Sequence, residues 1–310
     1  MFLKGRDLLS IHDLGVDEVE ELLDFAADLK TMCKKDATPH LLRGKTLGMI
    51  FEKSSTRTRV SFEVGMYQLG GSALFLSNRD LQLGRGEPIK DTARVLSRYL
   101  DGIMIRTFGH DRLIEFAKYA DIPIINGLSD LLHPCQVLTD LLTIREFKGK
   151  RFKDLKMAYV GDGNNMANSY LYGAAKVGMA LTVATPQSHK PNDEVFKNAL
   201  EDAKETGAQL QLTEDPIAAV KDADIIATDT WASMGQESEH DERKKIFAPY
   251  QVNDELLSHA NKSAIVMHCL PAYRGEELTD EVFERNAEVI FEEAENRLHV
   301  QKAIMAATMR

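Results

Sequence analysis

Cysteine is scarce in this 310-residue sequence. Its three cysteines, Cys33, Cys135 and Cys269, are odd in number and scattered, and no pair has the spacing of a CxxC metal-binding motif. This pattern argues against a disulfide-stabilised scaffold and against a structural zinc site. We expect reduced thiols in a cytoplasmic protein that holds no metal.

Long apolar runs and an excess of basic residues are also missing. The N-terminal stretch MFLKGRDLLS places charges where a signal peptide needs an apolar core, and no run approaches the length of a membrane span. The net charge is −10, whereas a general nucleic-acid binder would show a broad basic face. We therefore expect a soluble intracellular protein that binds neither nucleic acid nor membrane.

Short apolar runs of strand length alternate with amphipathic stretches along most of the chain. A helix is expected over residues 16–35, where apolar residues recur at helical spacing. Strands are expected at residues 47–51, 73–76, 102–106, 122–125, 156–160, 181–184, 209–212, 225–228 and 264–268. This alternation predicts an α/β fold with parallel sheets covered by helices on both faces.

The polar, basic stretch FKGKRFK at residues 147–153 is the expected domain boundary. It separates two doubly wound domains, at residues 1–148 and 149–294. A final helix over residues 295–310 lies beyond the last strand and could pack on either domain.

Residues that follow the strands are the candidates for chemistry, because ligands of open parallel sheets bind beyond the carboxyl ends of the strands. In the first half these are the segment FEKSSTRTR, Arg106 and the segment HPCQ. In the second half they are GDGNN, DTWASMG and HCLP. The first set gathers cations, hydroxyls and a histidine, whereas the second gathers amides, a carboxylate and a thiol.

The segment FEKSSTRTR stands between a strand and a helix. Unpaired N–H groups at a helix N-terminus, together with Ser55, Thr56, Arg57 and Thr58, would form a cradle for an oxyanion such as phosphate. The alternative is an ordinary capped helix start with solvated arginines, and this motif alone does not decide between them. Arg106 and His133 at other strand ends favour the anion site.

Two familiar nucleotide motifs are absent. No GxxxxGK[ST] sequence occurs, and GDGNNM has Met166 where a dinucleotide fingerprint has its third glycine. The following strand ends in Ala184 and Thr185, where an acidic ribose ligand would be expected. A nucleotide-dependent dehydrogenase is therefore disfavoured.

The cradle, together with HPCQVLTDLLTI, DTWASMGQE and HCLPAYRG, resembles the aspartate/ornithine carbamoyltransferase family over essentially the whole chain. The STRTR and HPxQ elements are similar to those that bind carbamoyl phosphate throughout the family. The SMG and HCLP elements are similar to those of its ornithine branch. The resemblance implies a carbamoyl-phosphate-binding first domain, joined by the C-terminal helix, and an ornithine-binding second domain.

The resemblance also implies roles for individual residues. Arg106, His133 and Cys269 would be catalytic, with His133 polarising the carbamoyl carbonyl and Cys269 orienting the δ-amine of ornithine. The residues that would bind carbamoyl phosphate are Ser55, Thr56, Arg57, Thr58, Gln82, Arg106, His133, Pro134, Cys135, Gln136, Cys269, Leu270 and Arg297. Those that would bind ornithine are Asn165, Asp229, Ser233 and Met234.

Structural alternatives exist for several of these residues. His133 could serve only as an N-cap partner before Pro134, Asp229 could cap a turn, and Arg297 could be a solvated surface residue. Trp231 is assigned to packing, and Cys135 is expected to contribute backbone contacts only.

The implied reaction is transfer of the carbamoyl group from carbamoyl phosphate to L-ornithine, giving L-citrulline and phosphate without metal or organic cofactor. The alternatives are a carbamoyltransferase for another amine such as putrescine, and a non-catalytic ligand-binding relative. The sequence does not set the direction of the reaction, towards arginine synthesis or arginine breakdown.

The segment 77–90, SNRDLQLGRGEPIK, is long and polar for a connection between a strand and a helix. It could be a solvent loop without a role. The family resemblance implies a homotrimer, or a higher assembly of trimers, in which this segment brings Gln82 to a neighbour's site.

Overall fold

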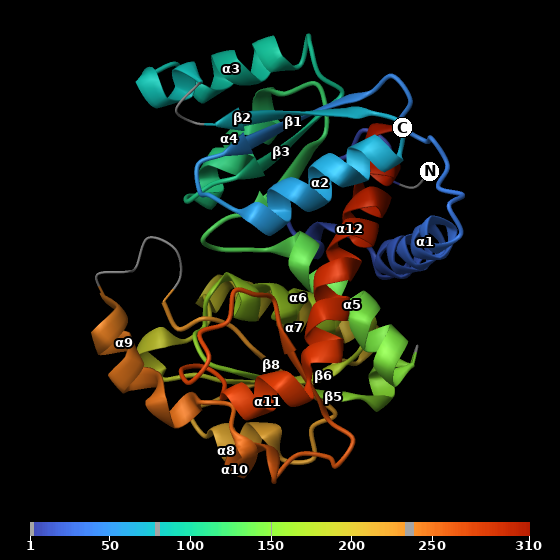
Figure 1. The fold of residues 1–310 in the computed structure, drawn as a ribbon. Helices are drawn as coiled ribbons and strands as arrows, with labels where there is room; N and C mark the ends of the chain where they lie inside the picture. The colour runs from blue at the N-terminus through green and yellow to red at the C-terminus, as the bar shows by residue number, and fades with distance from the viewer. Residues whose placement is uncertain (1–2, 78–80, 150, 233–238) are drawn as a thin grey trace. The chain divides into compact units, whose positions relative to one another are not determined.

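The structure is a computed structural model that describes residues 3–77, 81–149, 151–232 and 239–310. The chain forms two compact units, each an α/β layer structure (Figure 1). Unit 1 contains Met1–Leu142 and Asn296–Arg310, and unit 2 contains Thr143–Glu295. No helix among the described residues is long and apolar enough to cross a membrane.

Unit 1 is built on a four-stranded parallel sheet with the order β2-β1-β3-β4. Its strands are β1 (Thr46–Phe51), β2 (Ser72–Ser77), β3 (Gly102–Arg106) and β4 (Ile124–Leu128). The register pairs Phe51 with Arg106. The ends of the two central strands therefore bring the segment after Phe51 beside Arg106, at the edge where ligands of such sheets bind.

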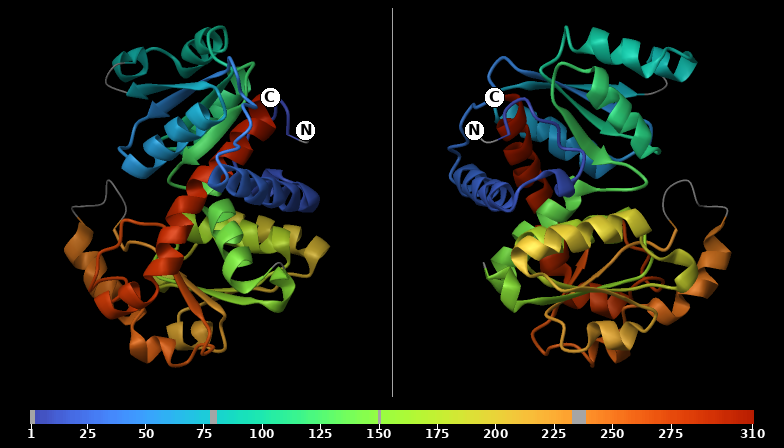
Figure 2. Two further views of the ribbon diagram at one scale, coloured as in Figure 1. Left: turned by 45° about the vertical axis from the view of Figure 1, so that its right-hand side comes forward. Right: turned by 180° about the vertical axis from the view of Figure 1, so that it is seen from behind.

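Helices cover both faces of this sheet. Those of unit 1 are α1 (Val16–Lys34), α2 (Thr56–Gln68), α3 (Ile89–Leu96) and α4 (His110–Tyr119), with short 3₁₀ turns at Ile11–Asp13 and Gln82–Arg85. The carboxyl-terminal part of α12 (Ala287–Met309) lies alongside α1 and α2 (Figure 2). A Cβ at Gly65 would lie 2.9 Å from the Met305 side chain, so α2 and α12 approach closely at this glycine.

Unit 2 is built on a five-stranded parallel sheet with the order β7-β6-β5-β8-β9. The strands are β5 (Lys156–Val160), β6 (Ala180–Ala184), β7 (Leu210–Thr213), β8 (Ile225–Thr228) and β9 (Ile265–His268). Its helices are α6 (Asn165–Val177), α7 (Asp193–Thr206), α8 (Pro216–Val220), α9 (His240–Phe247), α10 (Asp254–Leu257) and α11 (Asp280–Arg285). Helix α5 (Pro134–Lys148) begins in unit 1 and ends in unit 2.

Each sheet has its own apolar core. In unit 1, Ile50, Ile103 and Ile105 pack against Leu113 and Phe116 of α4. In unit 2 the core includes Val160, Ile226, Phe247, Val266 and Phe283. Buried β-branched residues on neighbouring parallel strands explain why these runs appear apolar throughout and do not alternate with polar residues.

The predicted α/β class and the parallel sheets are confirmed, with some shifts at the ends of elements. The strand expected at residues 122–125 instead runs from Ile124 to Leu128. It begins after Pro123, and its second half was missed in the sequence because the buried Asn126 interrupts the apolar run. The Nδ2 of Asn126 donates to the Leu9 carbonyl at 2.9 Å, which allows a polar residue inside the sheet. The final helix was expected from residue 295, but α12 begins earlier, at Ala287.

Candidate active site

The N-terminus of α2 follows β1 directly, as the sequence predicted. Ser55 is the N-cap, and its hydroxyl accepts a hydrogen bond from the Thr58 N–H at 3.2 Å. Thr56 is exposed, Arg57 is half-buried and Thr58 is buried. The capping alternative is therefore correct for Ser55, and it also presents the first turn of α2 at the ligand edge of the sheet.

The cations of this segment have different roles. Lys53 forms an ion pair with Asp130 and lies 4.3 Å from the centre of the Phe108 ring. Arg59 contacts Glu63 at 3.5 Å and lies over a neighbouring aromatic ring. Among the residues that the structure describes, no carboxylate forms an ion pair with Arg57. Arg57 is thus the cation of this segment that remains available for an anionic ligand.

Two further arginines lie buried near this turn. Arg106 ends β3, and its carbonyl accepts from the Glu52 N–H at 2.8 Å. Arg297 of α12 donates to the Thr58 hydroxyl at 2.7 Å and also to the Gln136 side-chain oxygen. The surface alternative for Arg297 is wrong, because only 4% of this residue is exposed.

His133 directly precedes α5, where Pro134 is the first helical residue. The His133 carbonyl accepts from the N–H groups of Gln136 and Val137, so its backbone does begin the helix. Burial lowers the pKa of the His133 imidazole well below its usual value, and the charges of Arg297 and Arg106 lower it further. The imidazole is therefore neutral at neutral pH and can donate one N–H to a ligand.

The other two residues of the HPCQ element point into the protein. Burial raises the pKa of the Cys135 thiol to about 12, and Sγ donates to the Asn126 carbonyl at 3.3 Å. Gln136 is fully buried and donates from Nε2 to Asp140 at 2.8 Å. Cys135 is thus a packed thiol, and its backbone contact with a ligand stays a prediction.

Gln82 begins the 3₁₀ turn Gln82–Arg85, and its side chain is exposed. Among the described residues, no hydrogen bond joins the Gln82 side chain to the group formed by Arg106, His133 and Arg297. The structure of one chain therefore does not bring Gln82 to the residues with which the sequence grouped it.

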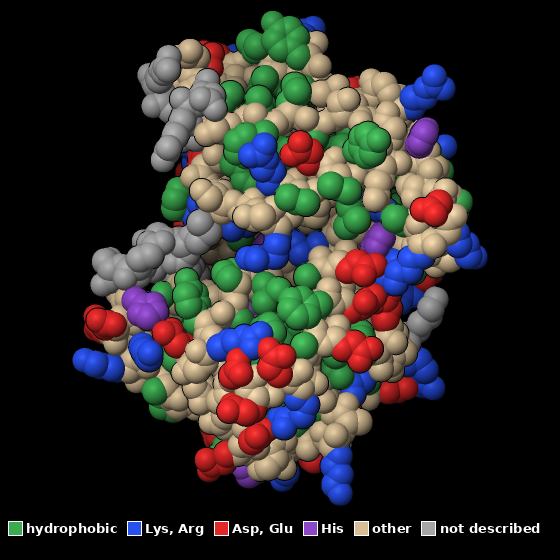
Figure 3. All heavy atoms as spheres, in the orientation of Figure 1, with side chains coloured by type: hydrophobic (Ala, Val, Ile, Leu, Met, Phe, Trp, Pro, Cys, Tyr) green, Lys and Arg blue, Asp and Glu red, His purple; other side chains and the backbone are tan. Residues whose placement is uncertain are grey.

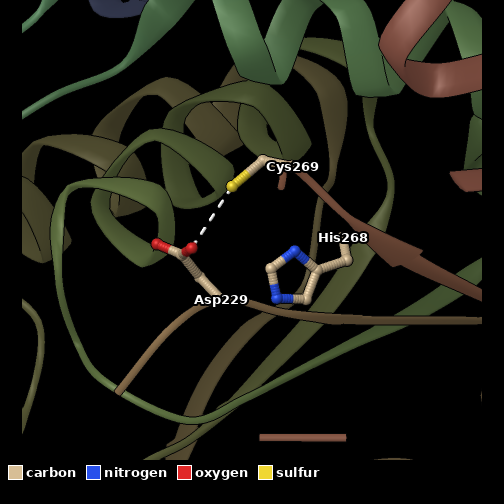
Figure 4. A group of neighbouring side chains, drawn as sticks. All are labelled: Asp229, His268 and Cys269. Atoms are coloured by element: carbon tan, nitrogen blue, oxygen red, sulfur yellow. Dashed lines mark hydrogen bonds between the residues drawn. The ribbon is translucent and has the colours of Figure 1, made fainter. Parts of the chain in front are cut away.

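A second group of polar residues lies at the carboxyl edge of the sheet in unit 2. Asp229 follows β8, and its Oδ1 accepts from the Cys269 thiol at 3.2 Å and from the Thr230 N–H at 2.8 Å (Figure 4). Its Oδ2 accepts from Asn164 at 2.8 Å. Asp229 does hold a turn, as the structural alternative predicted, and it also accepts a hydrogen bond from Cys269.

Asn164 is a residue that the sequence analysis missed. It is the N-cap of α6, accepts from the Met166 N–H at 2.9 Å, and receives a hydrogen bond from the Tyr159 hydroxyl at 3.2 Å. The signal was present, because an asparagine directly before a helical stretch is a preferred N-cap. Asn165, the predicted ligand, is the buried first residue of the same helix.

The DTWASMG segment is only partly described. Ser233 and Met234 lie outside the described residues. Trp231 is 4% exposed and stacks on Phe247 with ring centres 6.1 Å apart, which agrees with its assignment to packing. The Trp231 carbonyl accepts from Arg243 of α9, which also pairs with Asp162. Burial raises the pKa of Asp162 to about 7, although Arg243 opposes this shift.

Asp229, His268 and Cys269 are close enough together to suggest a metal site, with one ligand atom from each lying within 4.8 Å of the others. The hydrogen bonds of His268 argue against it. Its Nδ1 accepts from the Leu270 N–H at 2.9 Å, and its Nε2 lies 2.9 Å from Glu277 Oε1. Because both ring nitrogens of His268 already have hydrogen-bond partners, neither is available as a ligand, and these residues do not fit a resident metal ion.

Comparison with known proteins places both units in one family. A family model described as aspartate/ornithine carbamoyltransferase, carbamoyl-P binding domain, matches residues 6–146. A second, described as the Asp/Orn binding domain of the same family, matches residues 153–308.

Relatives and solved structures match over nearly the full length. An ornithine carbamoyltransferase from Carboxydothermus hydrogenoformans is 58% identical over 302 residues, which cover 97% of this chain and 97% of that protein. One from Oceanobacillus iheyensis is 56% identical and covers 99% of this chain and 95% of its own length. The solved ornithine carbamoyltransferase from Pyrococcus furiosus is 53% identical, with a TM-score of 0.96 and coverage of 100% of this chain and 98% of that one.

Proposed function

The chain belongs to the aspartate/ornithine carbamoyltransferase family, and we propose that it transfers the carbamoyl group of carbamoyl phosphate to the δ-amine of L-ornithine. The products are L-citrulline and phosphate, a reaction of arginine metabolism. The observation that supports this most strongly is the buried group formed by Arg106, His133 and Arg297 beside the N-terminus of α2. Buried cations next to free helix N–H groups are suited to a phosphorylated substrate.

Unit 1 binds carbamoyl phosphate in this proposal. Arg57 and the first turn of α2 contact the phosphate, assisted by the buried Arg106 and Arg297. The remaining contacts within the chain are assigned to Ser55, Thr56, Thr58, His133, Pro134, Cys135, Gln136, Cys269 and Leu270. Arg297 also holds Thr58 at 2.7 Å, so α12 fixes the first turn of α2 from behind.

The neutral His133 donates an N–H to the carbamoyl oxygen. When the δ-amine attacks the carbamoyl carbon, a C–N bond forms and this oxygen becomes negative. The C–O bond to phosphate then breaks, the amine nitrogen passes a proton to the departing phosphate, and inorganic phosphate leaves. A fixed donor beside two guanidinium groups stabilises the negative oxygen without any nucleophilic side chain, because the substrate amine is itself the nucleophile.

Unit 2 binds ornithine. The carboxylate of Asp229 is suited to the α-ammonium group, and Asn165, Ser233 and Met234 are assigned to the amino-acid end of the substrate. Cys269 lies 3.2 Å from Asp229, where its thiol orients the δ-amine and helps it lose a proton. Putrescine differs from ornithine only in lacking the α-carboxylate, so discrimination against this diamine comes from the residues that face that carboxylate and not from Asp229.

The active form is a homotrimer in which Gln82 of one chain reaches the carbamoyl phosphate of a neighbour. Hydrophobic side chains gather on the face formed by α2 and β2 (Figure 3), and this supports such a contact. Tyr67 on this face is 80% exposed. A groove of 1260 Å³ on this face is lined by residues from Phe51 to Ser77, Ser55 and Thr56 among them. The other exposed hydrophobic side chains of this face are Val60, Val64, Leu74 and Phe75.

The state of the cysteines indicates the cellular compartment. Cys33, Cys135 and Cys269 are all free. Because free thiols persist in reducing compartments, we assign the protein to the cytoplasm.

The direct test is a citrulline assay with ornithine, putrescine and aspartate as parallel acceptors. We expect turnover with ornithine at a kcat/KM about 100-fold above that for putrescine, since losing the charge-assisted contacts of the α-carboxylate costs about 3 kcal/mol. Comparable rates with putrescine would assign the chain to another amine. No product with any acceptor, despite carbamoyl phosphate binding by calorimetry, would indicate a non-catalytic relative.

A further inference from the structure

We propose that His268 and Glu277 are positioning residues that set the backbone around Cys269 for the reaction. Neither belongs to the ligand-contacting sets, and both are essentially inaccessible to solvent, with 1% and 0% exposure. The inference rests on the proposed function of unit 2, because Cys269 matters only if it faces the substrate amine.

The two residues form a relay of hydrogen bonds across nine positions of sequence. Glu277 Oε1 lies 2.9 Å from His268 Nε2 and accepts from the Tyr273 N–H at 2.7 Å. His268 Nδ1 accepts from the Leu270 N–H at 2.9 Å. The buried Glu277 carboxylate therefore orients the Tyr273 N–H directly and the Leu270 N–H through His268.

The relay defines the protonation of the imidazole. A backbone N–H can only donate, so Nδ1 must present its lone pair to Leu270 and cannot hold a proton. The ring proton then lies on Nε2 and is donated to Glu277. An acid that fixes the tautomer of a histidine, which in turn orients a functional group, is the arrangement found around many metal ligands. Here the oriented group is a peptide N–H.

That peptide belongs to a residue in an unusual conformation. Leu270 has φ of 59°, in the left-handed region that residues with a Cβ rarely adopt. On the other side of Cys269, the His268 N–H donates to Glu293 at 3.0 Å. The thiol is thus held between two anchored residues, and this places its Sγ 3.2 Å from Asp229.

A role in packing alone would not require these side chains. Burying a carboxylate and an imidazole together is costly, and apolar residues of similar volume often replace such pairs without loss of stability. The relay instead supplies what an apolar pair cannot, an acceptor for the Leu270 N–H at a fixed position.

The test uses two substitutions of His268 that retain different halves of the relay. In His268→Asn the amide oxygen can take the place of Nδ1 and accept from Leu270. In His268→Gln the amide nitrogen can take the place of Nε2 and donate to Glu277. We expect His268→Gln to lower kcat/KM for ornithine by about 10- to 100-fold, the usual effect of removing such an orienting partner. His268→Asn should retain several-fold more activity, and neither should change carbamoyl phosphate affinity measured by calorimetry.

Glu277→Gln has a matched control in the adjacent Glu276→Gln. The Glu276 carboxylate lies near the surface with Lys244 and His240, outside the relay. We expect Glu277→Gln to lower kcat for ornithine and Glu276→Gln to leave it unchanged. Equal effects of the two substitutions, or equal effects of His268→Asn and His268→Gln, would overturn the proposal.

Two readouts do not depend on activity, so they separate this inference from the proposed function. In a Cys33→Ser background, the iodoacetamide alkylation rate of Cys269 should change with Glu277→Gln and not with Glu276→Gln. In the unaltered protein, ¹⁵N NMR of labelled histidines should show His268 in the Nε2–H form. An Nδ1–H form overturns the relay even if Glu277→Gln fails to fold. If the protein makes no citrulline but shows both signatures, the hydrogen-bond relay is supported and the proposed function is refuted.

Discussion

Replacing Arg57 by alanine separates binding of the anion from stability of the fold. Arg57 is half-buried at the first turn of α2, and no carboxylate among the described residues pairs with it. Surface substitutions that remove no buried contact usually change the free energy of unfolding by less than about 0.5 kcal/mol. The melting temperature of Arg57→Ala should therefore lie within about 2 °C of the parent protein.

The effect on catalysis should be far larger. In the proposed reaction, Arg57 contributes a charged, forked donor at a helix N-terminus, where charge on the leaving phosphate increases in the transition state. Removing one such donor costs about 2.7–4 kcal/mol, or roughly 10²–10³ in rate. We expect kcat/KM to fall by that factor, with weaker carbamoyl phosphate binding and unchanged secondary structure. Arg57→Lys should recover part of the loss, because it restores the charge without the fork.

Arg94→Ala is the matched control. Arg94 lies on α3 of the same unit, pairs with Asp91 at 3.5 Å and lies over the Tyr119 ring. An exposed pair of this kind is worth about 0–1 kcal/mol, so this variant should lose a little stability and no activity. Steady-state kinetics, calorimetry and thermal melts of the three variants complete the comparison. Activity within tenfold of the parent in a folded Arg57→Ala protein would refute the phosphate assignment.

Four further expectations concern the thiol, the substrate amine, the histidine and the assembly. Cys269→Ala should weaken use of ornithine far more than binding of carbamoyl phosphate. If calorimetry showed the opposite, the assignment of Cys269 to ornithine would be wrong. Activity should rise above neutrality, because the free δ-amine has a pKa near ~10, like lysine. The pKa of His133 is lower in the folded chain than in the unfolded one. Below about pH 6.5 the unfolded chain therefore binds more protons, and the free energy of unfolding should fall as pH drops. Urea titrations that run parallel for the parent and His133→Gln across pH 5–8 would contradict this. Finally, inactive Arg57→Ala and Gln82→Ala chains, unfolded together and reassembled, should give activity well above the sum of the two. A mixture that stays at that sum, with mixed trimers detected by mass, would mean that each chain works alone.

Local patterns were sufficient to predict the layers and the edges at which functional residues gather. Strand–helix alternation predicted two parallel sheets, and the ends of β1 and β3 lie side by side because Phe51 pairs with Arg106. Prediction was weaker where a polar residue lies within a strand. Asn126 is buried in β4, and only its bond to the distant Leu9 carbonyl makes that possible.

Several features of the site depended on residues too far apart in sequence for any local pattern to relate them. The Arg297 donation to Thr58 spans 239 positions, so the sequence alone left Arg297 as a possible surface residue. The link between Asn164 and Asp229 spans 65 positions, and the N-cap role of Asn164 did not reveal it.

The sequence by itself determined the succession of strands and helices along the chain, a helix start after the first strand and the residue types at each strand end. These follow from the periodicity of side chains and from capping preferences, which act over a few residues. Only the tertiary structure decided which ionisable groups are charged and which atoms already have hydrogen-bond partners. His133 is neutral because folding buries it beside Arg106 and Arg297, and His268 is occupied because folding places it between Leu270 and Glu277. Burial and electrostatic interaction depend on distances in space, which only the folded chain defines.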